Sequence, residues 1–158
     1  GGLNYVNNSG RNDIILSKVA VDKESVFFYV ETKDKISSYT KSNWMLLLID
    51  ADKNSSTGWF GYDFLVNKNV IDEGRTSLLR YDTATSSWVT SGELKYSVSE
   101  NQMEIAVSRQ LLGLTEKSFT FDFKWSDNPA ELKDPISLCV NGDTAPNRRF
   151  NFRCIWNQ

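Results

Sequence analysis

Residues 44–67 read W-M-L-L-L-I-D-A-D-K-N-S-S-T-G-W-F-G-Y-D-F-L-V-N, and this stretch decides how the fold is interpreted. Residues 44–49 are continuously apolar, which is typical of a central strand that is covered on both faces. In residues 60–67 large apolar side chains recur at every second position, which predicts a second strand. The segment between them is acidic and ends in Thr-Gly-Trp. The stretch therefore predicts a pair of strands joined by an acidic loop.

The same alternation of apolar and polar side chains, interrupted by turn-forming residues, recurs along the rest of the chain. It predicts strands over residues 13–21, 26–32, 70–71, 77–81, 94–98, 103–107 and 119–125, with a turn at 67–69 and a closing hairpin within 136–156. Residues 108–113 have helical character, with Ser108 as the N-cap and Gly113 at the end of one turn. This pattern predicts an all-β fold, a two-sheet antiparallel β-sandwich of the jelly-roll or immunoglobulin-like kind with one short helical turn.

Length and composition indicate a single domain. The chain has 158 residues, of which 40% are hydrophobic and 13% aromatic, enough to bury a core. Residues 1–12 are rich in Asn, Gly and Ser and are interpreted as an N-terminal lead-in segment, followed by one β-sandwich domain over 13–158. The chain begins with glycine and carries no signal peptide, so we interpret it as a processed or recombinant piece of a longer protein.

The absence of histidine excludes several kinds of catalytic and metal site. Ser-His-Asp triads, Cys-His pairs and histidine-ligated zinc all require an imidazole. Two cysteines cannot supply the four thiolates of an all-cysteine zinc site. A net charge of -2 without a dense run of Lys or Arg argues against nucleic-acid binding. No apolar run approaches the roughly 20 residues that a membrane helix needs, so membrane insertion is not expected.

The acidic loop is the clearest candidate site. Asp50, Asp52 and Asn54 follow one another at a spacing of two, and Asp63 lies across the turn. Calcium prefers oxygen ligands of this kind, so these four residues are the predicted ligands of a Ca²⁺ ion. The alternative is a turn in which Asp and Asn side chains accept hydrogen bonds from the amides of their own loop. Both interpretations remain open from the sequence.

Aromatic side chains near predicted loops form the second candidate site. Sugars bind by stacking on the faces of Trp and Tyr rings. Trp59, Tyr62 and Trp88 are the candidate ligand-binding residues, and Trp44 is a further candidate. A tryptophan in a sandwich more often belongs to the core. That is the expected role of Trp125, which ends a face of alternating aromatic residues.

The two cysteines raise the question of a disulfide. In the predicted closing hairpin, alternation places the sulfur atoms of Cys139 and Cys154 on opposite faces of the sheet, where they cannot bridge. We therefore predict two free thiols.

Several motifs together resemble a known group of bacterial domains. They are D-x-D-x-N-x-x-T-G-W-x-G-Y-D-F at 50–64, V-F-F-Y-V-E-T at 26–32, I-A-V-S-R-Q-L-L-G at 105–113, F-K-W-S-D-N at 123–128 and V-N-G-D-T-A-P-N-R-R-F-N at 140–151. The chain is similar, from about residue 12 to 156, to family 9 carbohydrate-binding modules and the related DOMON-like β-sandwiches of secreted proteins from Bacteroides-type gut bacteria.

The resemblance implies an extracytoplasmic β-sandwich, attached to a larger polysaccharide-processing protein and often holding calcium. The tryptophan pair with which family 9 modules clamp a sugar has no residue-by-residue match here. The haem-binding DOMON branch needs axial ligands, so no haem is expected in a chain without histidine. We therefore expect a non-catalytic carbohydrate-binding-like module, whose partners are a polysaccharide or oligosaccharide and a neighbouring domain.

Two alternatives stay open. The first is a ligand-free structural domain that packs on a neighbouring catalytic domain. The second, less favoured, is a glycoside hydrolase, which needs two carboxylates roughly 5 to 9.5 Å apart across a cleft.

Overall fold

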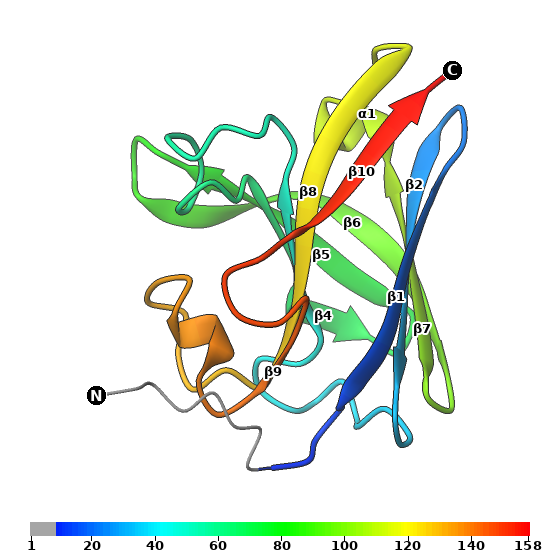
Figure 1. The fold of residues 1–158 in the computed structure, drawn as a ribbon, viewed down its shortest axis with the longest axis vertical. Helices are drawn as coiled ribbons and strands as arrows, with labels where there is room; N and C mark the ends of the chain where they lie inside the picture. The colour runs from blue at the N-terminus through cyan, green and yellow to red at the C-terminus, as the bar shows by residue number, and fades with distance from the viewer. Residues whose placement is uncertain (1–8) are drawn as a thin grey trace.

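The alternating segments form one antiparallel β-sheet (Figure 1). The computed structural model describes residues 9–158, and in this part of the chain the sheet contains ten strands. The strands are β1 (Ile14–Val21), β2 (Ser25–Thr32), β3 (Leu46–Asp50), β4 (Phe64–Asp72), β5 (Arg75–Asp82), β6 (Ser87–Ser99), β7 (Gln102–Ser108), β8 (Ser118–Asp127), β9 (Asp143–Ala145) and β10 (Phe152–Asn157). A helical turn, α1 (Arg109–Leu112), and a 3-10 turn, η1 (Ser137–Cys139), complete the elements.

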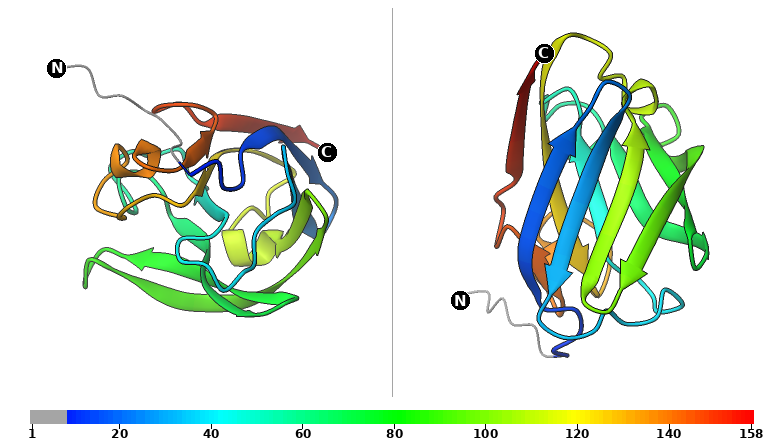
Figure 2. Two further views of the ribbon diagram at one scale, coloured as in Figure 1. Left: turned by 90° about the horizontal axis from the view of Figure 1, so that it is seen from below. Right: turned by 90° about the vertical axis from the view of Figure 1, so that its right-hand side faces the viewer.

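The strands hydrogen-bond in the order β1-β2-β7-β6-β5-β4-β3-β8-β10, and β9 pairs with the last residues of β8. The sheet curls so that its two halves face each other around the core (Figure 2). The predicted all-β sandwich is therefore confirmed, with the two layers formed by the two halves of one continuous sheet. The acidic loop and α1 lie at the upper end in Figure 1, and the connection from β2 to β3 lies at the lower end.

The main core fills the space between the two halves. Alternate residues of β2 are buried, and Phe28 is fully covered. Its ring meets those of Phe121 and Phe123 from β8 edge-on, with centroids 5.9 and 5.2 Å away. Contacts of this geometry add stabilisation beyond the buried area itself. Trp125 is also fully buried, as predicted.

The continuous apolar run of β3 is explained by a second cluster on the outer face of the sheet. Leu47 and Ile49 point into the main core, whereas Leu46 and Leu48 belong to the outer cluster. All residues of β3 are buried, which confirms the prediction of a strand covered on both faces.

The predicted strand over residues 60–67 is wrong in its boundaries. Trp59 and Tyr62 exchange backbone hydrogen bonds of 2.8 and 3.0 Å in a tight turn, so β4 begins only at Phe64. The predicted turn at 67–69 is wrong as well. Asn67 adopts a positive φ of 67° at an irregularity in the pairing, and β4 continues to Asp72. Periodicity alone does not reveal such a bulge.

The predicted closing hairpin is also wrong. Residues 137–139 form a 3-10 turn, and β9 and β10 each pair with β8 instead of with each other. The carboxylate of Asp134 accepts hydrogen bonds from the amides of Ile136 and Ser137, which favours this turn over a strand. Cys139 and Cys154 are free, as predicted, but Cys139 lies on the turn, so strand alternation is not the reason.

The predicted helical turn is present as α1. Gly113 ends it in the left-handed conformation, with φ of 70°, whereas Ser108 makes no capping hydrogen bond through its side chain. Arg109 anchors the turn. Its buried guanidinium donates hydrogen bonds to backbone carbonyls and lies over the rings of Phe119 and Trp156, at 4.8 and 4.4 Å from their centroids.

Part of the predicted lead-in segment is built into the fold. Asp127, which is fully buried, accepts hydrogen bonds from Arg11 at 2.8 Å, from the side chain of Asn12 at 3.0 Å and from the Met45 amide at 2.9 Å. These contacts fasten residues 11–12 to β8 and to the start of β3.

Candidate metal centre

The acidic loop connects two neighbouring antiparallel strands. Asp50 is the last residue of β3, and Asp63 directly precedes β4. Ile49 pairs with Phe64, and the amide of Asp63 donates a 2.8 Å hydrogen bond to the carbonyl of Ile49. Antiparallel pairing therefore brings the two carboxylates to the same end of the sheet.

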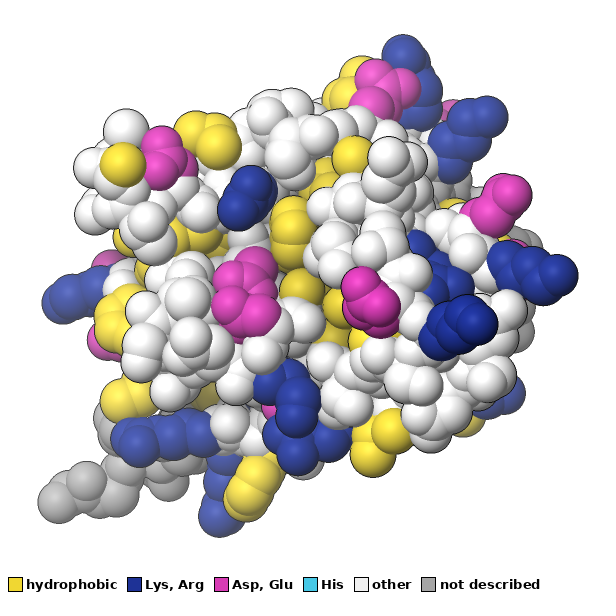
Figure 3. Space-filling view, turned by 90° about the horizontal axis from the view of Figure 1, so that it is seen from above, with side chains coloured by type: hydrophobic (Ala, Val, Ile, Leu, Met, Phe, Trp, Pro, Cys, Tyr) yellow, Lys and Arg dark blue, Asp and Glu magenta, His cyan; other side chains and the backbone are white. Residues whose placement is uncertain are grey.

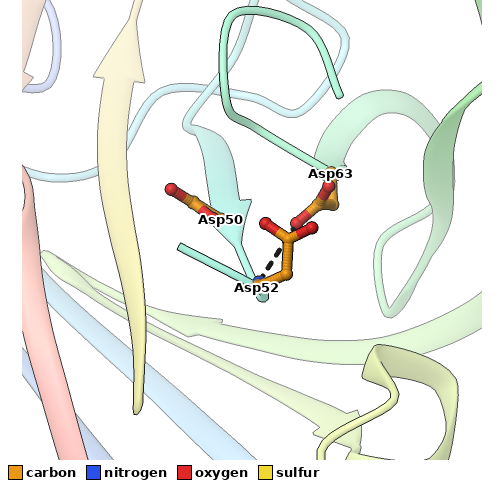
Figure 4. A group of neighbouring side chains, drawn as sticks. All are labelled: Asp50, Asp52 and Asp63. Carbon is orange, nitrogen blue, oxygen red and sulfur yellow. Dashed lines mark hydrogen bonds between the residues drawn. The ribbon is translucent and has the colours of Figure 1, made fainter. Parts of the chain in front are cut away.

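Three of the four predicted ligands lie together. One carboxylate oxygen from each of Asp50, Asp52 and Asp63 lies within 4.8 Å of the other two. In Figure 4 the carboxylates of Asp52 and Asp63 face each other, and that of Asp50 lies beside them on the β8 side. The spacing of the acids in the sequence was thus a sufficient signal for this group.

The loop also uses several of these side chains for its own turns. Asp52 accepts hydrogen bonds from the amide of Asn54 at 2.8 Å and from the hydroxyl of Thr57 at 2.8 Å. The side-chain oxygen of Asn54 accepts a 3.0 Å bond from the amide of Ser56. The side chains of Asp52 and Asn54 therefore accept hydrogen bonds from amides of their own loop, as the alternative to a metal site predicted.

Asp50 differs from its neighbours because it is buried without a full set of partners. Its exposed fraction is 8%, and its Oδ1 atom has no hydrogen-bond partner in the described part of the chain. Burial raises the pKa of Asp50 to about 6, and the charges of Asp63, Asp52 and Asp122 act in the same direction, against the amide of Lys53. An ionised carboxylate that is buried without a full set of hydrogen bonds destabilises the fold unless a positive charge compensates it.

Asp63 shares this environment to a lesser degree. Burial raises its pKa, and the charge of Asp52 adds to the effect. Hydrogen bonds from the amides of Ala51 and Asp52, at 2.8 and 3.4 Å, act in the opposite direction, as does the charge of Arg80. The two most buried acids of the group therefore both resist ionisation.

Gly61 keeps space open beside these oxygens. Its φ is 99°, and a β-carbon there would lie 3.3 Å from the α-carbon of Ser55, 3.8 Å from Oδ2 of Asp50 and 3.9 Å from the backbone carbonyl of Asn54. The Asn54 carbonyl, which accepts hydrogen bonds from the amide and hydroxyl of Thr57 at 3.1 and 2.8 Å, is a candidate ligand that sequence reasoning missed. A set of carboxylates with a backbone carbonyl suits calcium, so the residues present fit this ion.

An open hollow leads to the site from solvent. It has a volume of about 380 Å³ and lies between Asp52 and Asp63 on one side and α1 on the other, with Arg80 at its wall. Figure 3 shows this end of the molecule, where apolar side chains are visible in the depressions between charged and uncharged groups.

Comparison with known proteins gives no assignment: no family model, curated protein or solved structure matches the chain. Among the described residues, no helix is long and apolar enough to cross a membrane.

The predicted aromatic residues form a packed group on the outer face of the sheet. Trp59 and Tyr62 belong to the outer cluster and are 9% and 5% exposed. Trp88 is half-buried, with its ring centroid 6.3 Å from that of Trp59, and Trp44 is buried in the main core. The structure therefore brings the three candidate ligand-binding residues together but leaves little ring surface on two of them.

Phe60 is an aromatic residue of this group that sequence reasoning missed. Its side chain is 59% exposed, and its ring packs edge-on against Trp59 with centroids 5.3 Å apart. Alternation had placed Phe60 inside a strand, whereas its positive φ of 51° turns it outward. Phe60 and Trp88 are the members of the group that offer ring surface to a ligand.

Proposed function

We propose that this chain is a non-catalytic, calcium-binding β-sandwich module that binds carbohydrate as an accessory part of a larger secreted or surface polysaccharide-processing protein. The observation that carries the calcium part is the buried, unpartnered oxygen of Asp50 within a group of three carboxylates. A divalent cation supplies the positive charge that this group lacks.

The carboxylates of Asp50 and Asp63 and the backbone carbonyl of Asn54 are the proposed ligands, with Asp52 at the edge of the site. The bound ion would supply electrostatic compensation and hold the loop closed, because binding to the folded state alone stabilises that state.

The grouping of the acids favours a binding role over hydrolysis. A glycoside hydrolase places its carboxylates on either side of a scissile bond, roughly 5 to 9.5 Å apart. Here the oxygens gather within 4.8 Å of one another, and Asp52 is held by Thr57. This arrangement suits one shared ion better than a sugar between two acids.

The carbohydrate part rests on the resemblance of the motifs and on the rings of Phe60 and Trp88. Exposed aromatic faces beside a rigid loop are suited to stacking against sugar rings. If this surface binds a glycan, Trp88→Ala should weaken binding in calorimetric titrations by about tenfold, the effect of losing one stacking contact of roughly 1.5 kcal/mol. Phe150→Ala, which removes another exposed aromatic ring, is the matched control and should leave the affinity unchanged.

A second candidate is a ligand-free structural domain. The burial of Trp59 and Tyr62 favours it, because these rings serve packing more than recognition. A folded protein that binds no member of a broad panel of plant and host glycans would favour this candidate over the carbohydrate-binding one.

The calcium part is tested by titrating Ca²⁺ into chelator-treated protein in a calorimeter. We expect one binding event in the wild type and none in Asp50→Asn, which removes a ligand charge with little change in shape. Glu104→Gln, which neutralises an exposed carboxylate on β7, is the control and should bind like the wild type. Calcium binding that is equal in all three proteins would refute the assignment of Asp50.

A further inference from the structure

A second hollow lies at the opposite end of the molecule from the acidic loop. The connection between β2 and β3 crosses the lower end of the sandwich (Figure 2). Together with residues 67–70 of β4 it encloses an open space of about 590 Å³. Its walls include the half-buried ring of Tyr39 and side chains with amide, hydroxyl and ammonium groups.

Asn67 is a buried residue in the wall of this hollow. It lines the hollow yet is only 2% exposed. Its amide nitrogen donates a 2.8 Å hydrogen bond to the carbonyl of Met45 and faces the sulfur of Met103 at 3.8 Å. Its Oδ1 atom is buried and has no partner among the residues that the structure describes. Because this oxygen has almost no accessible surface, a ligand in the hollow does not reach it, and Asn67 shapes the wall without being a binding group.

Two lysines give the hollow a positive charge. The ammonium of Lys68 donates a 3.1 Å hydrogen bond to the side-chain oxygen of Asn43, and the amide nitrogen of Asn43 donates to the carbonyl of Pro129 at 2.9 Å. Asn43 is thus fixed and holds Lys68 beside the hollow. Lys41 is exposed on the facing segment, and no Asp or Glu is among the described residues that line this space.

The groups in these walls indicate the chemistry of the ligand. The exposed side chains of Asn69 and Ser42 can both donate and accept hydrogen bonds, as hydroxyl groups of a ligand do. The two exposed ammonium groups favour an anionic group as partner. A molecule that carries several hydroxyls and a negative charge satisfies both.

We propose that this hollow binds an acidic saccharide, whose carboxylate or sulfate pairs with Lys41 and Lys68 and whose hydroxyls meet the exposed side chains of Asn69 and Ser42. The choice of a saccharide rests on the proposed function, whereas the site and the charge of the ligand follow from the residues of the hollow. This site is separate from the surface of Phe60 and Trp88.

A neighbouring hollow gives room for more than one sugar unit. It has a volume of about 450 Å³ and shares the side chain of Tyr39 as a wall. Ser38, Lys35, Tyr96 and the acidic side chain of Glu73 are also among its lining residues. Tyr39 therefore stands between two hollows, where one ring can contact consecutive units of a chain. The proposed ligand is an oligosaccharide rather than a monosaccharide.

The test is calorimetric titration with three hexasaccharides at fixed low free calcium: an oligogalacturonate, a sulfated glycosaminoglycan fragment and the neutral cellohexaose. We expect at least one acidic hexamer to bind more tightly than cellohexaose, with an affinity that falls as salt is raised. Lys41→Ala/Lys68→Ala should weaken it at least about tenfold, since the variant removes both cationic partners of the anionic group.

The control is Lys95→Ala/Lys117→Ala, which removes two exposed lysines elsewhere and should change nothing. Asn69→Ala, at another exposed position, should also weaken binding and does not disturb the buried Asn67. Which acidic hexamer binds distinguishes a uronate from a sulfate ligand.

Two results would overturn the proposal in distinguishable ways. If acidic hexamers bind but only Trp88→Ala weakens them, the sugar site lies at the aromatic surface, and the proposed function survives without this one. If no saccharide binds the folded protein, the proposed carbohydrate function and this site both fail.

Discussion

A single carboxylate oxygen distinguishes Asp50 from the other acids of its loop. Asp52 is satisfied by the loop itself, whereas Oδ1 of Asp50 has no partner among the described residues. The raised pKa of Asp50, about 6, follows from this burial and from neighbouring carboxylates. The proposed calcium ion explains why an acid is present at such a position.

The raised pKa gives the metal-free protein a defined pH dependence. Native Asp50 keeps its proton up to about pH 6, while the unfolded residue loses it near 3.8. The contribution of this group to the free energy of unfolding is therefore greatest at low pH and is lost as pH rises from about 4 to about 6, by up to about 3 kcal/mol. Denaturant unfolding in chelator should show this fall in the wild type and a smaller one in Asp50→Asn; identical profiles would contradict it.

Gly61 offers a test of the space beside Asp50. In Gly61→Ala the β-carbon enters the gap between the Asp50 carboxylate and the Asn54 carbonyl, so calcium affinity should fall by about tenfold or more, and the positive φ should cost roughly 1 kcal/mol of stability. Gly113→Ala is the matched control. It has a positive φ of 70° but no atoms within 4 Å of the added carbon. It should lose stability without losing calcium affinity in the same titration.

At the scale of elements, Lys124 of β8 holds the segment that connects β9 to β10. Its side chain is buried, and its ammonium donates hydrogen bonds of 2.6, 2.7 and 2.9 Å to the carbonyls of Pro146, Arg148 and Phe150. Burial lowers the pKa of Lys124 to about 8. These bonds hold the segment between β9 and β10, and they help to explain why the predicted closing hairpin does not form.

Replacing this lysine should loosen that segment. Lys124→Met keeps the length of the side chain but leaves three carbonyls without their donor, so the free energy of unfolding should fall by about 2–4 kcal/mol. Hydrogen exchange should accelerate at the backbone amides of residues 147–150. Lys95→Met, an exposed position on β6, is the control and should change neither quantity. Unchanged exchange in Lys124→Met would show that other contacts hold the segment.

At the scale of the molecule, periodicity was enough to predict an all-β sandwich, because strands such as β2 and β7 bury every second side chain and so show an alternating pattern in the sequence. The buried run of β3 and the acidic group Asp50-Asp52-Asp63 could also be predicted from the sequence, because both depend on the spacing of residues that are close together in the chain. The sequence did not reveal features that depend on distant contacts. The bulge at Asn67 and the burial of Trp59 are of this kind.

The effect of calcium on the melting temperature is the measurement that tests the central claim most directly. At pH 7, calcium at about 100 times its dissociation constant should stabilise the folded state by about 2.7 kcal/mol and raise the melting temperature by about 5–10 °C over that in chelator. Asp50→Asn should show no such difference, while Glu104→Gln should respond like the wild type. A wild-type protein that melts at the same temperature in saturating calcium and in chelator would contradict the proposed metal centre.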